Sequence, residues 1–233
     1  MSHLGMFAKY WQAGRVKTRL ATRLGDQLAA DVYLVFLEHL TYTLEPCCDQ
    51  RTLVVSPWKS RDMFESKFGD TWNYQPQSDG DLGNRLSDFF WQTARQTGAS
   101  GKIIVIGSDT PQLGPDIISQ TEQRLDSYPV VLGPSQDGGY YLVAINANFV
   151  SADIDLFKEM PWSTDQVLAE TLKRLVDHEL RYYLLPEMSD VDDFAGLQRL
   201  WQELKDATGP SDQQLLERLR SAVSVMFQEG VIR

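Results

Sequence analysis

The stretch KIIVIGSDTP, residues 102–111, carries the strongest structural signal in the chain. Lys102 is followed by consecutive β-branched aliphatic residues, a pattern typical of a central parallel strand that is covered on both faces. Gly107 and Ser108 then turn the chain, and Asp109 follows them. Because ligands of open α/β sheets bind at the carboxyl ends of the strands, we expect Asp109 to lie at a binding site.

Segments on both sides of this strand alternate between strand and helix patterns. Short β-branched runs predict strands, and apolar residues at three- and four-residue spacing predict helices. The predicted strands cover residues 4–8, 52–56, 71–75, 102–106, 130–132, 140–145 and 182–185. The predicted helices cover residues 26–45, 61–68, 82–94, 116–125, 163–176, 194–205 and 211–227. This alternation predicts an α/β fold with a largely parallel sheet.

Polar residues mark where three of these helices are predicted to begin. Asp26 is the predicted N-cap of the first helix. Ser163 with Gln166, and Ser211 with Gln214, have the spacing of a capping box. Each pattern predicts that a helix starts at its capping residue.

Length and composition predict one large domain with a short appendage. The chain has 233 residues, of which 42% are hydrophobic and 23% charged, as in ordinary globular proteins. Residues 1–208 are predicted to form the domain, and residues 209–233 a C-terminal amphipathic helical extension. The apolar stripe of this extension either packs on the domain or joins two chains in a homodimer. The stripe consists of Leu215, Leu216, Leu219, Val223, Met226 and Phe227.

Several classes of protein are disfavoured. A net charge of −10 argues against nucleic acid as a partner, because binding to phosphate backbones needs a broad basic surface. No apolar run approaches the roughly 18 residues that span a bilayer, and the N-terminus lacks the features of a signal peptide. Cys47 and Cys48 have no companions, which fits a reducing compartment. We therefore expect a cytoplasmic protein without a membrane partner.

The segment Lys9–Arg23, KYWQAGRVKTRLATR, is the most basic part of this acidic chain. It contains five of the 22 Lys and Arg residues, and no acidic residue precedes Asp26. It also lies between a predicted strand and a predicted helix, a geometry that binds phosphate. We predict a phosphate site in which Lys17 and Arg19 are the principal cations and Arg15 is solvated or structural. The alternative is a solvated charged segment, and without substrate we expect Lys17 itself to be solvated.

Two aspartates are candidate metal ligands. Asp109 is suited to bind Mg²⁺ that bridges phosphates, and the alternative is an Asx-turn or a cap. Asp192 follows the last predicted strand and could face Asp109 across the cleft, and the alternative is a solvated acidic turn. The sequence therefore predicts a Mg²⁺ or Mn²⁺ site at Asp109, completed by Asp192.

Three further motifs are ambiguous between local structure and ligand contact. Asp137, Gly138 and Gly139 either allow the backbone to approach a ligand closely or form a hairpin turn. The DGDLG segment at residues 79–83 is either a turn or a substrate loop. Trp162 either stacks on a base or sugar or belongs to the core.

Several motifs together resemble a known family. They occur in the same order in bacterial glycosyltransferase-like proteins of unknown function with the GT-A fold, associated with radical-SAM or selenoprotein gene sets. These are similar to the molybdenum-cofactor and phospholactate guanylyltransferases of the nucleotide-diphospho-sugar transferase superfamily. The resemblance spans about residues 7–197 and implies a three-layer GT-A fold with a mostly parallel central sheet. The motifs are FAKYWQAGRVKTRLA (7–21), GDLGNRL (80–86), IGSDTPQL (106–113), LGPSQDGGYYLV (132–143), PWSTDQVLAET (161–171) and DVDD (190–193).

The resemblance also implies roles for individual residues. The nucleotide phosphates would be lined by Gly14, Lys17 and Arg19, and the base or sugar would be flanked by Gly80, Asp81 and Gly83. The acceptor or sugar would be approached by Asp137, Gly138 and Gly139. The metal would be bound by Asp109 and Asp192.

This scaffold supports three functions. The first is nucleotidyl transfer from an NTP to a phosphorylated or anionic small acceptor, and the second is glycosyl transfer from a nucleotide sugar. Ser108 and Thr110 flank Asp109 where glycosyltransferases of this fold usually carry a D-x-D motif, which favours the first function. The third is a nucleotide-binding protein without turnover. The expected partners are thus a nucleotide or nucleotide sugar, an unknown small acceptor, and Mg²⁺ or Mn²⁺.

Overall fold

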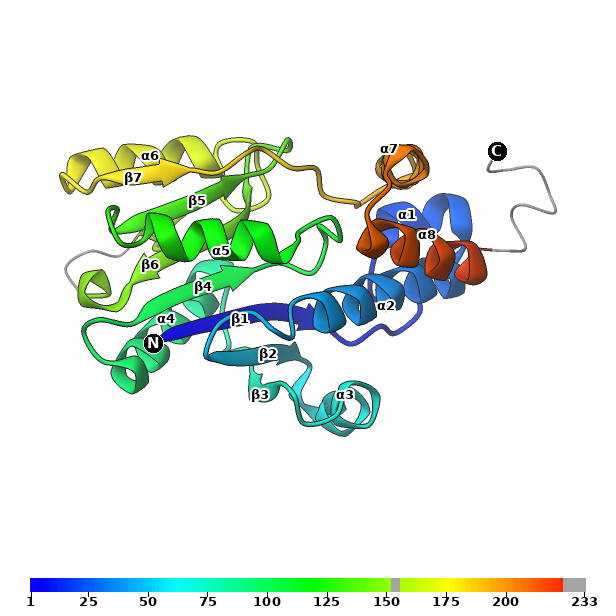
Figure 1. The fold of residues 1–233 in the computed structure, drawn as a ribbon, viewed down its shortest axis with the longest axis horizontal. Helices are drawn as coiled ribbons and strands as arrows, with labels where there is room; N and C mark the ends of the chain where they lie inside the picture. The colour runs from blue at the N-terminus through cyan, green and yellow to red at the C-terminus, as the bar shows by residue number, and fades with distance from the viewer. Residues whose placement is uncertain (152–155, 224–233) are drawn as a thin grey trace.

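A single seven-stranded sheet lies between helical layers (Figure 1). The structure is a computed structural model and describes residues 1–151 and 156–223. The strands are β1 (Ser2–Lys9), β2 (Gln50–Ser56), β3 (Asn73–Pro76), β4 (Lys102–Ile106), β5 (Val130–Pro134), β6 (Tyr140–Asn146) and β7 (Tyr182–Leu184). The helices are α1 (Thr18–Leu24), α2 (Asp26–Thr43), α3 (Arg61–Phe68), α4 (Leu82–Thr97), α5 (Pro115–Arg124), α6 (Val167–Asp177), α7 (Phe194–Asp206) and α8 (Pro210–Ala222). No helix in these two ranges is long and apolar enough to cross a bilayer.

The strand order of the sheet is β3-β2-β1-β4-β6-β5-β7. Strand β6 runs antiparallel to both of its neighbours, and the other described pairs of strands are parallel. The predicted mostly parallel α/β sheet is therefore confirmed. The prediction for β4 has the correct bounds, but this strand has one parallel neighbour, β1, and one antiparallel neighbour, β6.

The side chains of β4 explain why its sequence is apolar after Lys102. Ile104 and Ile106 point into the core beneath α2 and α5. Ile103 and Val105 point into the opposite core, which contains Phe89 of α4. Both faces of the strand are buried from Ile103 to Ile106, so a polar side chain at any of these four positions would be costly.

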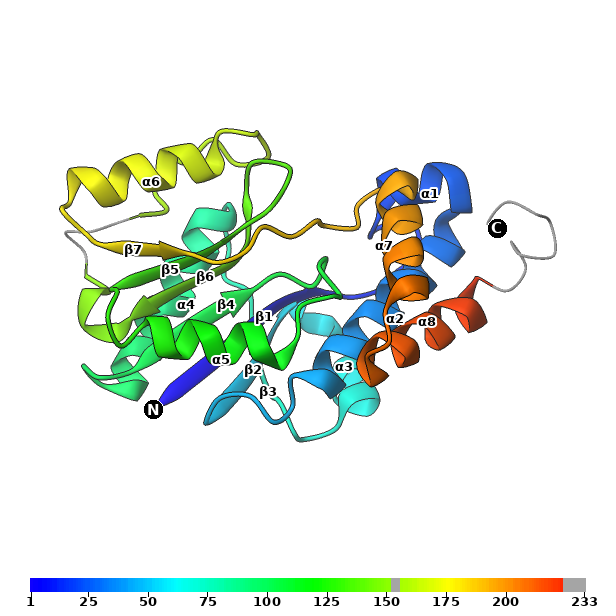
Figure 2. The same ribbon diagram turned by 45° about the horizontal axis from the view of Figure 1, so that its top comes forward.

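A helical cluster of α1, α2, α7 and α8 packs beyond the carboxyl end of β1 (Figure 2). Its buried core includes Leu20 of α1, Phe36 of α2 and Trp201 of α7. The part of the predicted C-terminal stripe that the structure describes is buried here, against the same chain, and consists of Leu215, Leu216, Leu219 and Val223. Met226 and Phe227 lie outside the described residues, and a homodimer stays a prediction.

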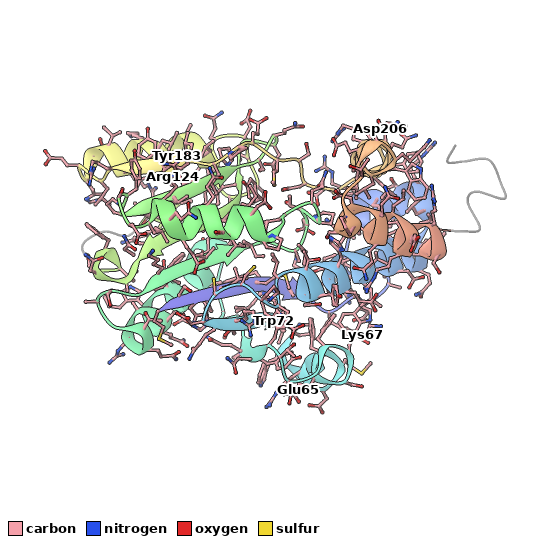
Figure 3. The ribbon with its side chains drawn as sticks, viewed as in Figure 1. Glu65, Lys67, Trp72, Arg124, Tyr183 and Asp206 are labelled. Carbon is pink, nitrogen blue, oxygen red and sulfur yellow. The ribbon has the colours of Figure 1, made fainter. Side chains whose placement is uncertain are left out.

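Aromatic side chains link the outer elements to their neighbours. The guanidinium carbon of Arg124, on α5, lies 4.3 Å from the ring centroid of Tyr183, on β7 (Figure 3). Trp72 Nε1 donates a hydrogen bond to the Thr41 carbonyl at 3.1 Å and so joins the segment before β3 to α2. These contacts connect both edge strands of the sheet to its helical layer.

The three predicted capping residues are wrong, although the predicted range of the first helix begins at the observed residue, Asp26. Gly25 is the N-cap of α2, and Asp26 is its first helical residue. Helix α6 begins at Val167, and Ser163 lies before it with a φ of 64°. Helix α8 begins at Pro210, without a side-chain cap. Glycine caps a helix at little cost and proline suits the first helical position, so neither α2 nor α8 depends on a polar cap.

Candidate active site

A cleft of about 530 Å³ lies at the carboxyl ends of β1 and β4. Its charged lining is divided by sign. The cations come from the end of β1, the segment between β1 and α1, α1 itself and α4, and are Lys9, Arg15, Lys17, Arg19 and Arg85. The carboxylates come from the loop after β4 and the segment before α7, and are Asp109, Asp190 and Asp192. The cleft therefore lies at the strand end where the sequence places Asp109.

Lys17 is held between two carboxylates. Its Nζ lies 2.5 Å from Asp109 Oδ1 and 3.0 Å from Asp192 Oδ1. The Lys17 side chain is 4% exposed, whereas those of Asp109 and Asp192 are 45% and 48% exposed. The expectation of a solvated Lys17 is therefore wrong, because the fold brings two distant aspartates to its ammonium group.

Lys17 reaches this position because it is the N-cap of α1. Its φ of 47° is left-handed, a conformation that a non-glycine residue keeps only where its surroundings hold it. The backbone N–H of Val191 donates to the Asp109 carbonyl at 2.9 Å, which places Asp192 beside Asp109. Helix α1 was missed from the sequence because its seven residues are too few to show a helical period.

The Lys17 ammonium keeps its charge despite burial. Burial alone would lower the pKa of Lys17, but the Asp109 and Asp192 carboxylates raise it, and the net pKa lies above its ordinary value. A buried ammonium depends on such partners, since an unpaired buried charge is strongly destabilising. The three residues therefore act as one electrostatic unit.

A buried chain of hydrogen bonds supports the ends of β1 and β4. The Lys9 backbone N–H donates to Tyr33 Oη at 3.0 Å, and Ser108 Oγ donates to the Phe7 carbonyl at 3.0 Å. Because the Ser108 proton is used there, Tyr33 Oη donates to Ser108 Oγ at 2.8 Å. Burial, followed by the Asp109 charge, raises the pKa of Tyr33, which keeps its proton. Tyr33 is a cleft residue that sequence reasoning treated only as part of a helix.

Gln77 and Arg85 were also missed from the sequence. Gln77 Nε2 donates to the carbonyls of Ala8 at 3.1 Å and Val54 at 2.9 Å. Arg85 donates from Nη1 to Gln77 Oε1 and from Nε to the Gly80 carbonyl, both at 3.1 Å. The Arg85 guanidinium is thereby fixed at the cleft. The GDLGNRL motif was the available signal, but it did not indicate which of its side chains enters the cleft.

Asp190 is a perturbed carboxyl in the same cleft. Thr110 Oγ1 donates to its Oδ1 at 2.8 Å. Burial raises the pKa of Asp190 to about 6, and the charges of Asp109, Asp137 and Asp192 add to this rise, whereas the Thr110 hydrogen bond opposes it. Its charge therefore changes just below neutral pH. Sequence reasoning chose Asp192 from this acidic run and did not single out Asp190.

Of the other residues of the predicted phosphate segment, the two arginines line the cleft and the glycine does not. Arg19, on α1, is exposed and lines the cleft. Arg15, predicted to be solvated or structural, is also exposed and lines the cleft. Gly14 lies in the turn before α1 with a φ of 72° and is outside the cleft lining.

Gly80, Asp81 and Gly83 build the start of α4. Asp81 is the N-cap of this helix, and its Oδ1 accepts a hydrogen bond from the backbone of the first turn at 2.9 Å. A Cβ on Gly83 would lie 2.3 Å from the Phe157 carbonyl oxygen, so this glycine permits close packing. Leu82 is the residue between them that lines the cleft.

Asp137, Gly138 and Gly139 form the turn of the β5–β6 hairpin. Asp137 Oδ1 accepts hydrogen bonds from the Gly139 N–H at 2.9 Å and from Ser135 Oγ. Gly138 has a φ of 86°, and a Cβ there would lie 2.3 Å from the Asp165 carbonyl oxygen. The turn therefore packs closely on the segment before α6.

Trp162 lies behind a residue of the cleft lining. Its ring packs edge-on against Tyr140, with 6.5 Å between the ring centroids. Tyr140 lines the cleft, whereas Trp162 does not. In the described structure Trp162 belongs to the core of α4 and α6 rather than to the cleft surface.

Asp109 and Asp192 have the chemistry to hold a divalent metal. In sites that bind phosphates, Mg²⁺ usually takes one or two carboxylates and completes its shell with phosphate oxygens and water. Two half-exposed carboxylates that already share one cation, Lys17, fit this requirement. Across residues 1–151 and 156–223, no group of three or more His, Cys, Asp or Glu side chains could hold a metal without such help.

The architecture is that of the nucleotide-diphospho-sugar transferases. A candidate enzyme of this class from Desulfovibrio desulfuricans G20 is 25% identical over 97% of each chain, with a TM-score of 0.86. A cytidylyltransferase from Leptospira borgpetersenii serovar Hardjo-bovis is 12% identical, covers 99% of this chain and 95% of its own, and has a TM-score of 0.56. The Mycobacterium tuberculosis H37Rv protein Rv0371C, in complex with manganese, is 14% identical over 87% of this chain and 99% of its own, with a TM-score of 0.50.

The chain belongs to the family described as "Uncharacterized protein conserved in bacteria (DUF2064)", whose profile matches residues 40–164. No curated protein sequence matches this chain. The matched range contains Asp109 and Asp137, whereas Lys17 and Asp192 lie on either side of it. The Desulfovibrio desulfuricans structure and the family match together confirm the resemblance to the nucleotide-diphospho-sugar transferase superfamily.

Proposed function

We propose that the protein is a metal-dependent nucleotidyltransferase that moves a nucleoside monophosphate from an NTP to a phosphorylated or anionic small acceptor. The observation that carries this proposal is the placement of Lys17 between Asp109 and Asp192 in a cleft that also bears Arg15 and Arg19. A cleft lined by both cations and carboxylates suits a triphosphate together with a metal ion. The fold, which is shared with a cytidylyltransferase, supports the same reaction class.

In the proposed reaction an oxygen of the acceptor attacks the α-phosphorus of the NTP. A new oxygen–phosphorus bond forms, the bond from the α-phosphorus to the bridging oxygen breaks, and pyrophosphate leaves with the electron pair. A phosphate acceptor attacks as an oxyanion, whereas a hydroxyl acceptor also releases a proton. Lys17 and Arg19 would neutralise the charge on the phosphoryl oxygens.

Asp109 and Asp192 would hold Mg²⁺ or Mn²⁺, which supplies electrostatic stabilisation of the leaving pyrophosphate when bound. A protein with this fold forms a complex with manganese, which supports the use of a divalent metal. Lys17 pairs with both carboxylates and would contact phosphate oxygens in the complex. Tyr33 and Gln77 would position the strand ends without touching the reacting atoms.

One observation favours a second candidate, glycosyl transfer from a nucleotide sugar. The Desulfovibrio desulfuricans structure, with a TM-score of 0.86, is described as a candidate nucleotide-diphospho-sugar transferase. In this reaction the acceptor oxygen attacks the anomeric carbon, and the nucleoside diphosphate leaves with the electron pair. The Ser108–Asp109–Thr110 sequence lacks the D-x-D pair usual in such enzymes, so we prefer nucleotidyl transfer.

A ligand screen with the full-length protein tests the proposal. Its melting temperature would be measured with each NTP and with UDP- and GDP-sugars, with and without Mg²⁺ or Mn²⁺, and pyrophosphate release would be followed with a panel of phosphorylated acceptors. Metal-dependent stabilisation by an NTP, with pyrophosphate release, supports nucleotidyl transfer. Stabilisation by nucleotide sugars alone supports glycosyl transfer, and binding without turnover supports a non-catalytic protein. If no nucleotide raises the melting temperature, all three functions are wrong.

Asp109→Asn isolates the metal site within this screen. We expect this variant to lose the dependence of nucleotide binding on metal, because it removes one of two carboxylate ligands. Asp177→Asn removes the same charge from the exposed end of α6 and is the matched control. A metal dependence that is equal in the two variants would contradict the assignment of Asp109.

A further inference from the structure

We propose that a hollow next to the cleft, lined by the three cations Lys9, Arg15 and Lys59, is a second site for a phosphate group. The hollow has a volume of about 290 Å³. Its uncharged lining consists of Tyr10, Gln12, Ser56 and Pro57. The proposal rests on the proposed function only in assuming that a phosphate-bearing ligand occupies the neighbouring cleft.

The hollow and the cleft adjoin one another. Lys9 and Arg15 line both of them, whereas Lys59 lines only the hollow and Lys17 only the cleft. A bound ligand, or two ligands side by side, can therefore contact cations from Lys17 through Arg15 to Lys59. This arrangement suits phosphate groups at more than one position.

The charge of the hollow is uncompensated within the protein. No acidic residue lines it, and in the described part of the chain neither Lys9, Arg15 nor Lys59 forms an ion pair. By contrast, Lys67 and Lys102 each pair with a carboxylate on the protein surface. Like charges that share a hollow repel one another, and a bound anion removes this repulsion.

Backbone hydrogen bonds hold the hollow in shape. The Tyr10 N–H donates to the Ser56 carbonyl at 2.8 Å and joins the segment after β1 to the end of β2. The Arg15 N–H donates to the Gln12 carbonyl at 2.9 Å and closes the turn that carries this arginine. Lys59 lies in a short 3₁₀ helix, Trp58–Ser60, which begins shortly after β2 ends at Ser56. The three cations therefore come from two segments that are fixed to each other.

An aromatic cluster supports one wall. The Tyr10 ring lies 5.0 Å from the Trp11 ring, which lies 5.0 Å from the Phe64 ring of α3, measured between centroids. Such packing limits movement of the segment that carries Lys9 and Arg15. A compact anion that accepts hydrogen bonds from ammonium and guanidinium groups fits this hollow, and phosphate has that chemistry.

Calorimetric titration of the full-length protein with inorganic tripolyphosphate at low ionic strength tests the site. Lys59→Gln removes the cation that belongs to the hollow alone, and Lys173→Gln removes the same charge from the exposed face of α6. We expect Lys59→Gln to weaken tripolyphosphate binding about three- to fivefold, as for one exposed ion pair. Lys173→Gln should leave it unchanged. Equal affinities in the two variants would overturn the proposal.

Two sources could supply the phosphate, and nucleotides distinguish them. If the hollow takes the terminal phosphates of an NTP, Lys59→Gln weakens binding of the triphosphate but not of the matching monophosphate. If it takes the phosphate of a second substrate, the variant binds both nucleotides normally but binds inorganic phosphate more weakly when the nucleotide site is saturated. A variant that shows neither loss overturns the proposal.

The same measurements separate this site from the proposed function. A wild-type protein that releases pyrophosphate from NTP, with a Lys59→Gln variant that binds every phosphate probe equally well, would retain the function and reject the site. A wild-type protein that binds no nucleotide, but binds tripolyphosphate in a Lys59-dependent way, would retain the site and reject the function.

Discussion

Lys17 Nζ lies 2.5 Å from Asp109 Oδ1, and the Lys17 side chain is 4% exposed. Asp192, in the segment before α7, has its Oδ1 3.0 Å from the same ammonium group. The residues proposed to bind phosphate and metal therefore also bind each other. This relationship makes the site testable with variants of single residues, without knowledge of the substrate.

Lys17→Met is expected to increase the affinity of the substrate-free protein for Mn²⁺. The change removes the cation that shares Asp109 and Asp192, and leaves two carboxylates without a counter-charge. We expect roughly tenfold tighter binding, corresponding to about 1.4 kcal/mol of relieved competition. Electron paramagnetic resonance of free Mn²⁺ measures this directly. Arg19→Met is the matched control, because Arg19 lines the same cleft but forms no ion pair with Asp109 or Asp192 in the described structure. Equal Mn²⁺ affinities in the two variants would rule out competition by Lys17.

Tyr33→Phe is expected to destabilise the fold by about 1–3 kcal/mol, the cost of leaving buried hydrogen-bonding groups without a partner. The variant removes the hydroxyl that accepts from the Lys9 N–H and donates to Ser108 Oγ. Tyr42→Phe is a control on the same helix, because Tyr42 is 60% exposed. Chemical denaturation of both variants gives the comparison, and equal stabilities would show that the hydrogen-bond chain contributes nothing.

Asp190→Asn is expected to change how stability depends on pH. The pKa of Asp190 is about 6 in the folded protein and about 3.9 in an unfolded chain. The folded state therefore binds more protons between these values, and the Asp190 contribution to the free energy of unfolding decreases as pH rises from about 4 to about 6. The variant lacks this decrease, which we expect to amount to about 1–2 kcal/mol after allowance for solvent screening.

Denaturation of wild type and Asp190→Asn at several pH values measures the difference. Burial lowers the pKa of His3 and His39 to about 4, so their contribution to the free energy of unfolding decreases as pH falls. Their effect has the opposite sign but is present in both proteins, and it cancels in the comparison. Parallel pH profiles would show that Asp190 does not titrate in this range.

Gly138→Ala is expected to be more destabilising than Gly98→Ala. Both glycines have positive φ, 86° and 72°, so alanine is strained at either position. A Cβ at Gly138 would also lie 2.3 Å from the Asp165 carbonyl oxygen. Among the described residues, no atom beyond the chain neighbours of Gly98 would lie within 4 Å of a Cβ there. We expect an additional cost of about 1–3 kcal/mol for Gly138→Ala, measured by thermal or chemical denaturation. Equal costs would show that the hairpin turn moves away from α6 without penalty.

The order of strands and helices was readable because it depends on local patterns. The β-branched run of β4 and the apolar spacing of α2 identify these elements without reference to the rest of the chain. The hairpin of β5 and β6 was one of two readings left open for Asp137–Gly139, whereas the antiparallel pairing of β6 with β4 was not readable, because β4 is distant from it in sequence. The start of α8 was also misjudged, since a proline at the first helical position replaced the expected serine cap.

The sequence by itself determined the α/β class, the superfamily resemblance and the two halves of the cleft, a basic segment before residue 24 and Asp109 after β4. Only the tertiary structure decided that Lys17 is buried, that Asp192 shares it, and that Tyr33 and Gln77 support the cleft. The reason is physical: composition and periodicity are properties of neighbouring residues, whereas these ion pairs and hydrogen bonds join side chains that the sheet and the helical cluster bring together from distant parts of the chain.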